Sequence, residues 1–167
     1  MKLLSGKTSW KTPPTTSIEV ISTSSGSGAV YPTSFTHWHD ESNVEVGGSI
    51  RIDTNSNVAY GTEIYQDPPA LNDSFSFSRN LKSGNYVLSI LTVGYTNSGI
   101  VKLEIDGTTS FDDLDLYSSS AIFNRVLTRN ITISTDETHK FRFTVIGKNP
   151  SSSNYYFSCR KIWANKT

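Results

Sequence analysis

The amino-acid sequence predicts an all-β protein: an antiparallel β-sandwich or jelly roll built as a single domain. Apolar and polar side chains alternate with a period of two over many short segments, as Val101, Leu103 and Ile105 do. Turn-forming pairs such as Asp106-Gly107 separate these segments. No segment shows the apolar spacing of a helix. Together, these observations favour two stacked sheets with a shared apolar interior.

The N-terminal third predicts a lead-in followed by four strands. Residues 1–17 are expected to be extended, because Pro13 and Pro14 favour an extended backbone, and the domain is expected to span 18–167. Strands are expected at 18–22, 29–37, 43–53 and 57–66. A Ser/Gly-rich loop follows the first of them. Asp67-Pro68-Pro69 ends the fourth, because proline cannot donate to a strand ladder.

The rest of the chain predicts eight further strands, most of them with a clear apolar face. They are expected at residues 73–79, 84–95, 99–106, 113–117, 121–126, 129–135, 139–147 and 154–163. The alternating apolar residues that identify six of them are Phe75/Phe77, Tyr86/Leu88/Ile90, Val101/Leu103/Ile105, Ile131/Ile133, Phe141/Phe143/Val145 and Tyr155/Phe157/Cys159. We expect a core shared between two sheets, containing Phe77, Leu88, Leu103, Phe143 and Phe157. Cys159 is expected to be a small buried apolar residue rather than a reactive thiol.

The segment 84–95 is apolar on both faces. Val87, Leu91 and Val93 alternate with Tyr86, Leu88 and Ile90. A strand buried on both faces lies inside a sheet that something else covers. Because no helix is expected, a neighbouring copy is the predicted cover, which suggests a homotrimer.

Composition excludes some classes of partner. The 167 residues carry a formal net charge of +0 with a pI near 6.8, whereas nucleic-acid binders usually show a basic excess. No apolar run approaches the about 20 residues that span a bilayer, so no membrane insertion is expected. Charged residues make up 18% of the chain, and Ser, Thr and Asn are abundant. Such surfaces suit an extracellular or virion location.

Catalytic and metal sites are not predicted. The sequence contains no Gly-x-Ser-x-Gly elbow or phosphate-binding glycine loop, and no pair of carboxylates stands out, so no enzyme activity and no cofactor are expected. His37 and His39 share one strand face and are the best metal-ligand candidates, but a pair of ligands is weak support for a zinc site. The alternative is that these histidines face solvent. The acidic run at 112–115 lacks the pattern of a calcium loop.

Aromatic residues in or near loops are the candidates for ligand contact, because an aromatic face can stack on a sugar ring. They are Trp38, Tyr60, Tyr65, Tyr95 and Trp163. Asn97, in the polar turn after Tyr95, and Lys148 and Asn149, in the loop from 147 to 156, would supply hydrogen bonds. Both loops can also be read as ordinary hairpin connections.

Several motifs resemble a known group of proteins. Residues 81–88 resemble an "L-x-x-G-x-Y-x-L" strand entry, and residues 98–107 resemble a "G-I-V-x-x-x-I-D-G" hairpin. Asp115-Leu116-Tyr117 matches "D-x-Y", and residues 139–156 resemble "H-x-L-x-x-x-x-x-G-K-N-x-S-S-x-Y". In this order, these motifs resemble jelly-roll domains of viral, mainly bacteriophage, tail fibres, receptor-binding proteins and capsid appendages. The resemblance implies a trimeric module of a virion, but it carries over no receptor-contacting residue.

Three functions follow as hypotheses. The first is a non-catalytic viral fibre or appendage head that engages host-surface glycan. The second is a virion decoration protein that binds other virion proteins and no receptor. The third is a secreted carbohydrate-binding module or small glycosidase, which sugar release in a simple assay would separate from the other two.

Overall fold

The computed structural model describes residues 30–38, 44–54 and 62–167, and this part of the chain is built from strands. The strands are β1 (Ser34–Trp38), β2 (Glu45–Gly47), β3 (Ile50–Thr54), β4 (Thr62–Gln66), β5 (Ser74–Leu81), β6 (Gly84–Gly94), β7 (Gly99–Ile105), β8 (Thr108–Asp115), β9 (Ile122–Ile133), β10 (Glu137–Lys148) and β11 (Ser158–Lys166). Nowhere in these ranges is there a helix long and apolar enough to cross a membrane. The predicted lead-in at 1–17 and the strand at 18–22 lie outside them.

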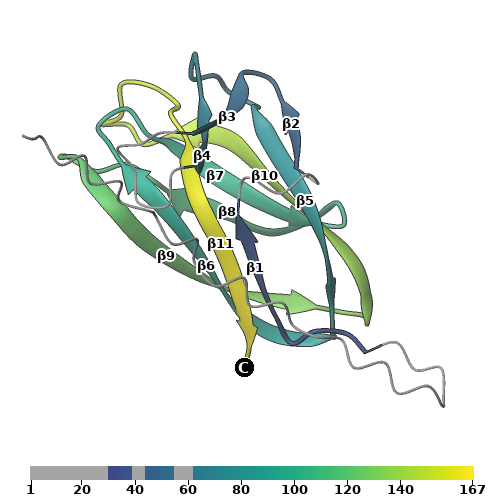
Figure 1. Cartoon of the computed structure of the whole chain (residues 1–167). Helices are drawn as coiled ribbons and strands as arrows, with labels where there is room; N and C mark the ends of the chain where they lie inside the picture. Colours follow the sequence, from purple (N-terminus) through teal and green to yellow (C-terminus); the bar gives the residue numbers. More distant parts are fainter. Residues whose placement is uncertain (1–29, 39–43, 55–61) are drawn as a thin grey trace, which may run out of the picture.

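The strands form two antiparallel sheets that stack as a sandwich (Figure 1). One sheet has five strands in the order β2-β5-β10-β7-β8. The other has six strands, in which β3-β4-β11-β6-β9 form a path and β1 pairs with β11. The predicted all-β sandwich is therefore confirmed.

The apolar core lies between the two sheets. All five residues predicted for it are buried there: Phe77, Leu88, Leu103, Phe143 and Phe157. Cross-strand aromatic pairs form its centre, with the ring centroids of Phe77 and Phe141 5.3 Å apart and those of Phe75 and Phe143 5.0 Å apart. Cys159 is fully buried, as predicted, and burial raises the pKa of its thiol.

Several predicted strand boundaries were wrong. The predicted strand 43–53 is two strands, β2 and β3, which belong to different sheets. The segments 121–126 and 129–135 are one strand, β9, because Leu127 and Thr128 between them continue the pairing with β6. The predicted strand 113–117 overlaps the end of a longer strand, β8, which begins at Thr108 directly after the two-residue turn Asp106-Gly107 and ends at Asp115. Both turn residues have positive φ, 52° for Asp106 and 80° for Gly107, which matches the mirror-image turn that suits tight hairpins.

The outer face of β6 is already covered within a single chain, so its apolar residues do not call for a trimer. Strand β6 lies inside its sheet, between β11 and β9, as its apolar residues predicted. On its outer face, Leu91 is 7% exposed and Val93 is 1% exposed within a single chain. These side chains are therefore covered without a neighbouring copy, and the homotrimer loses the observation that suggested it.

Candidate functional site

Three connections meet at one end of the sandwich, at the upper left of Figure 1. They follow β6, follow β8 and precede β11. Backbone hydrogen bonds join them: Ser153 N–H donates to the Thr96 carbonyl (3.0 Å) and Tyr156 N–H to the Asn97 carbonyl (2.8 Å). Ser118 N–H donates to the Tyr95 carbonyl (3.1 Å). The three connections, which are distant in sequence, are thus joined by hydrogen bonds into one surface.

An aromatic group lies at this end, and we call Tyr95, Phe123 and Tyr156 the loop-end platform. The ring centroids of Tyr95 and Phe123 are 5.9 Å apart with planes at 86°, and those of Tyr95 and Tyr156 are 5.8 Å apart. Phe123 is 60% exposed, although a phenylalanine is among the side chains most often buried. The packing of these rings holds an apolar surface open to solvent.

A β-bulge in β9 places Phe123 on this surface. Thr92 of β6 lies opposite Arg125, but Gly94 lies opposite Ile122, so β9 contains an extra residue here. Asn124 adopts the left-handed conformation (φ 57°), and its side-chain oxygen accepts a hydrogen bond from Arg160 Nη1 at 2.7 Å. The buried Arg160 thereby helps to fix the bulge that turns Phe123 outward.

Four of the predicted ligand residues come together at this end: Tyr95, Asn97, Lys148 and Asn149. The Lys148 ammonium lies 5.2 Å from the centroid of the Tyr155 ring. The Asn149 side-chain amide donates to an Asp115 carboxylate oxygen at 2.6 Å, and its oxygen accepts from Ser151 N–H at 3.0 Å. Asn149 therefore ties the loop to the end of β8, whereas Lys148 is exposed.

The other predicted aromatic residues lie elsewhere. Tyr60 and the side chain of Trp38 fall outside the described part of the structure. Tyr65 is half-buried on β4, opposite Ser158 of β11. Trp163 lies on β11 opposite Thr36 and Ser89, with the Lys161 ammonium 5.1 Å from its ring centroid.

Of the predicted metal pair His37 and His39, His39 lies outside the described residues. The interpretation of solvent-facing histidines is wrong for His37, which is fully buried. Its ring stacks on Phe77 with centroids 4.0 Å apart, and its Nδ1 lies 2.6 Å from Arg79 Nη2. Among the described residues, no three His, Cys, Asp or Glu side chains are grouped to hold a metal ion.

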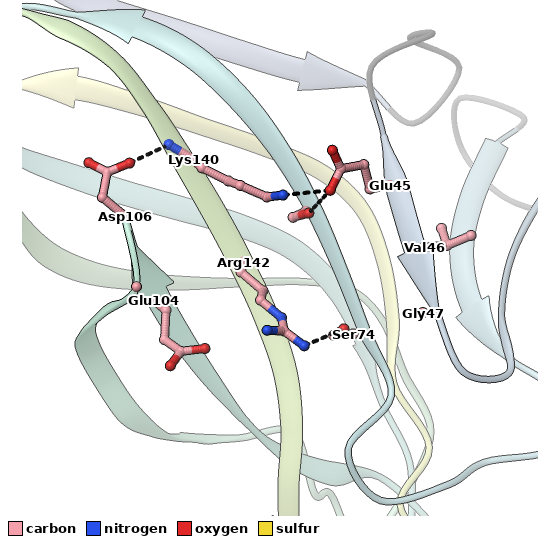
Figure 2. Close-up of a pocket in the computed structure, with 10 residues that line it drawn as sticks. Glu45, Val46, Gly47, Ser74, Glu104, Asp106, Lys140 and Arg142 are labelled. Carbon is pink, nitrogen blue, oxygen red and sulfur yellow. Dashed lines mark hydrogen bonds and ion pairs between the residues drawn. The ribbon is translucent and has the colours of Figure 1, made fainter.

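A second candidate region is a pocket on the outer face of the five-stranded sheet (Figure 2). Its volume is about 460 Å³, and its lining residues are Glu45, Val46, Gly47, Ser74, Ser76, Glu104, Asp106, Gly107, Lys140 and Arg142. The Lys140 ammonium contacts the Glu45 carboxylate at 2.5 Å, and Ser76 Oγ donates to the same carboxylate at 3.2 Å. The hydrogen bond from Lys140, followed by the one from Ser76, lowers the pKa of Glu45.

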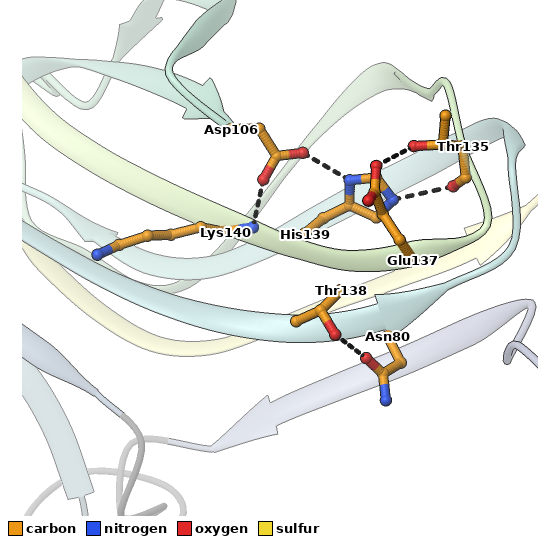
Figure 3. A network of polar contacts seen from close by, with 7 residues as sticks. All are labelled: Asn80, Asp106, Thr135, Glu137, Thr138, His139 and Lys140. Atoms are coloured by element: carbon orange, nitrogen blue, oxygen red, sulfur yellow. Dashed lines mark hydrogen bonds and ion pairs between the residues drawn. The ribbon is translucent and has the colours of Figure 1, made fainter.

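A polar network behind this pocket centres on His139 (Figure 3). The buried ring lies with Nδ1 2.6 Å from Asp106 Oδ2 and Nε2 3.0 Å from the Thr135 carbonyl oxygen. The other Asp106 oxygen accepts the backbone N–H of Lys140 at 2.7 Å. Asp106 therefore fixes the β7–β8 turn to β10, where the pocket begins. Asp106 and His139 also line a neighbouring pocket of about 430 Å³.

Acidification is expected to weaken the fold slightly through two exposed carboxylates. The hydrogen bond from Lys140 lowers the pKa of Glu45, and the backbone N–H of Ser83 lowers the pKa of Asp136. These two carboxylates stabilise the fold fully above their unfolded-state pKa values, near 4.5 and 3.8. Their contribution is lost as the pH falls through their lower pKa values in the folded protein. Thermal unfolding from pH 7 to pH 3 should show a small fall in midpoint that is flatter in the double variant Glu45→Gln/Asp136→Asn. Identical slopes in the two proteins would contradict this assignment.

Comparison with solved structures found similar folds among carbohydrate-binding modules. The chain is similar to part of a Paenibacillus xanthan lyase, at 22% identity and a TM-score of 0.66, over 86% of this chain and 14% of the lyase chain. It is similar to a family 35 carbohydrate-binding module from Clostridium thermocellum, at 11% identity and a TM-score of 0.63, over 81% of this chain and 100% of the module.

A further similar structure is the C-terminal family 6 carbohydrate-binding module of a laminarinase from Zobellia galactanivorans. The identity is 14% and the TM-score 0.60, over 80% of this chain and 99% of the module. Neither a scan against family models nor a search of curated proteins found a match.

These likenesses establish the fold alone, because all three identities are low. They give no support to the resemblance with viral fibre, receptor-binding and appendage domains, or to a virion location. The alternative of a carbohydrate-binding module fits them better. The chain has the jelly-roll β-sandwich fold that these carbohydrate-binding modules share.

Proposed function

We propose that this chain is a non-catalytic glycan-binding module whose ligand stacks on the loop-end platform. The observation that carries the proposal is the outward-turned Phe123, which is 60% exposed beside Tyr95 on a rigid sandwich. A large apolar ring held in solvent favours a binding surface over a purely structural role. The shared fold with carbohydrate-binding modules supports the same class of ligand.

The chemistry of the platform suits a sugar. A pyranose ring presents C–H groups on one face and hydroxyls around its edge, so an aromatic face and nearby polar groups can bind both. The rings of Tyr95 and Phe123 stand nearly perpendicular, which offers one face for stacking and a second ring edge beside it. Asn97 lies in the connection after β6 and the exposed Lys148 is the last residue of β10, and both would supply hydrogen bonds to the hydroxyls.

The proposal keeps the glycan ligand expected from the sequence and sets aside its viral setting. An extracellular site of action agrees with a polysaccharide ligand. A non-catalytic role agrees with a platform that consists of three aromatic side chains. If the protein instead released reducing sugar from any polysaccharide that it binds, the non-catalytic part of the proposal would fail.

Loss of the exposed ring is expected to abolish most glycan binding. Native affinity electrophoresis should be run with xanthan, laminarin, xylan and β-1,3-galactan in the gel, since sugars of these kinds appear in the names of similar proteins. We expect retardation of the wild-type protein by at least one polysaccharide. Phe123→Ala should weaken binding roughly tenfold or more, because a stacked aromatic ring contributes about 1–3 kcal/mol.

Leu71→Ala provides a matched control, because Leu71 is another exposed apolar side chain and lies in the connection before β5. It should bind like the wild type. Equal retardation of the Phe123→Ala and wild-type proteins would reject the platform as the binding surface. No retardation of the wild-type protein by any polysaccharide, together with no hit on a glycan array, would reject glycan binding itself.

A further inference from the structure

The pocket on the five-stranded sheet is built by a row of polar residues on neighbouring strands. Glu45 of β2 lies opposite Ser76 of β5, Ser76 lies opposite Arg142 of β10, and Arg142 lies opposite Glu104 of β7. Ser74 and Ser76 are buried at its floor, although they point away from the core. The pocket therefore has a fixed polar floor with charged groups arranged across it (Figure 2).

Both glutamates of this row already have a cationic partner. Lys140 contacts Glu45 at 2.5 Å, and Lys102, just outside the pocket, contacts Glu104 at 3.0 Å. The Asp106 carboxylate is held by the backbone N–H of Lys140 and faces the His139 ring. Two of the three carboxylates around the pocket are thus paired with lysine, and the third is held by hydrogen bonds.

Arg142 differs from the two lysines because it is not paired with a carboxylate of the described residues. Its Nη2 donates to the neutral Ser74 hydroxyl at 3.3 Å, and within the described residues it forms no ion pair. A guanidinium has several N–H donors in one plane and matches the two oxygens of a carboxylate or sulfate. In Figure 2, its head lies within the pocket, and Glu104 lies across β10 from Ser74.

We propose that this pocket binds an acidic sugar unit, whose carboxylate or sulfate group pairs with Arg142. Serine hydroxyls and the lysine-paired glutamates would take the hydroxyls of the same unit. The volume of about 460 Å³ lies in the range of small-ligand pockets. None of the described residues that line it is aromatic, so stacking of a neutral sugar would not be its source of affinity. This site is separate from the loop-end platform.

The test is isothermal titration calorimetry of the whole chain with three probes at pH 7: an oligogalacturonate, its methyl ester, and a sulfated galactan oligosaccharide. We expect binding of at least one charged probe and at least tenfold weaker binding of the ester, because the ester keeps the sugar ring and removes the charge. Preference for the carboxylate or the sulfate probe identifies the anionic group. Binding should weaken as salt is raised.

Arg142→Gln should weaken binding of the preferred anion roughly tenfold or more, since it removes a charge-assisted hydrogen bond. Arg142→Lys should lie between that variant and the wild type, because it keeps the charge and loses the planar geometry. Arg129→Gln removes an equal charge from β9 and should bind like the wild type. Equal affinity of Arg142→Gln and wild type, equal affinity for acid and ester, or no binding of either charged probe would each overturn the proposal. Because Phe123→Ala tests the loop-end platform and Arg142→Gln tests this pocket, either proposal can fail alone.

Discussion

Replacing Phe77 by alanine is expected to lower the free energy of unfolding by about 3–5 kcal/mol, the range for deleting a buried aromatic side chain. Phe77 lies at the centre of the core, where its ring centroid is 5.3 Å from that of Phe141 and 6.3 Å from that of Phe143. The ring of His37 also stacks on Phe77, with centroids 4.0 Å apart. Alanine would leave a cavity between strands of both sheets. Urea unfolding followed by fluorescence measures the loss.

Phe123→Ala is the matched control, because it makes the same chemical change at a solvent-exposed position. It should change stability by no more than about 0.5 kcal/mol, as surface substitutions usually do. Phe77→Leu, which leaves a smaller cavity, serves if Phe77→Ala does not fold. Similar losses at positions 77 and 123 would contradict the assignment of one ring to the core and the other to a surface platform.

Replacing His139 by alanine is expected to cost about 2–4 kcal/mol of stability. The substitution removes a buried side chain together with its polar contacts to the Asp106 carboxylate and the Thr135 carbonyl oxygen. Asp106 also forms part of the β7–β8 turn and accepts the backbone N–H of Lys140, so three segments lose a common link (Figure 3). Thermal and urea unfolding at pH 7 both report this loss.

Thr138→Ala tests whether the effect is specific to the buried network. The neighbouring Thr138 is exposed and hydrogen-bonds only at the surface, to the Asn80 side chain. Its replacement should cost no more than about 0.5 kcal/mol. A loss below about 1 kcal/mol for His139→Ala would mean that the network adds little to the fold, since deleting a buried side chain with its hydrogen bonds is expected to cost more than that.

The sandwich was predictable because its core residues alternate in sequence. Phe141, Phe143 and Val145 share one face of β10, and all three are buried between the sheets. A strand with one buried face shows this period directly. The ends of β8 and β9 were less predictable because they depend on cross-strand partners. The polar run at 128–130 looks like a break, yet β6 pairs with it throughout.

The loop-end platform was only partly predictable. Tyr95, Asn97, Lys148 and Asn149 are visible in the sequence because they lie in turn-rich segments between apolar strands. Phe123 and Tyr156 were missed, because their placement depends on a β-bulge and on hydrogen bonds between connections far apart in sequence. The one local signal for Phe123 is that Ile122-Phe123 begins a strand whose next outward residues are mostly polar.

The polar pocket gave no recognisable sequence signal. Glu45, Ser76, Arg142 and Glu104 come from four strands, and only their register brings them into one row. Each is an ordinary outward-facing polar residue when its own strand is considered alone. The motifs that resemble viral fibre domains include many turn and core positions, such as Asp106-Gly107, which many β-sandwiches need. They predicted the fold and suggested a biological setting that the comparisons do not support.

The most direct test of glycan binding at the loop-end platform is a nitrogen-15 NMR titration of the whole chain with the polysaccharide fragment that retards it in gels. The account predicts that the largest shifts fall on the backbone amides of residues 95–98, 122–125 and 153–156, with small changes along β3 and β4. Shifts concentrated on β5 and β10 with none at residues 95–98, or no shifts at saturating ligand, would contradict it.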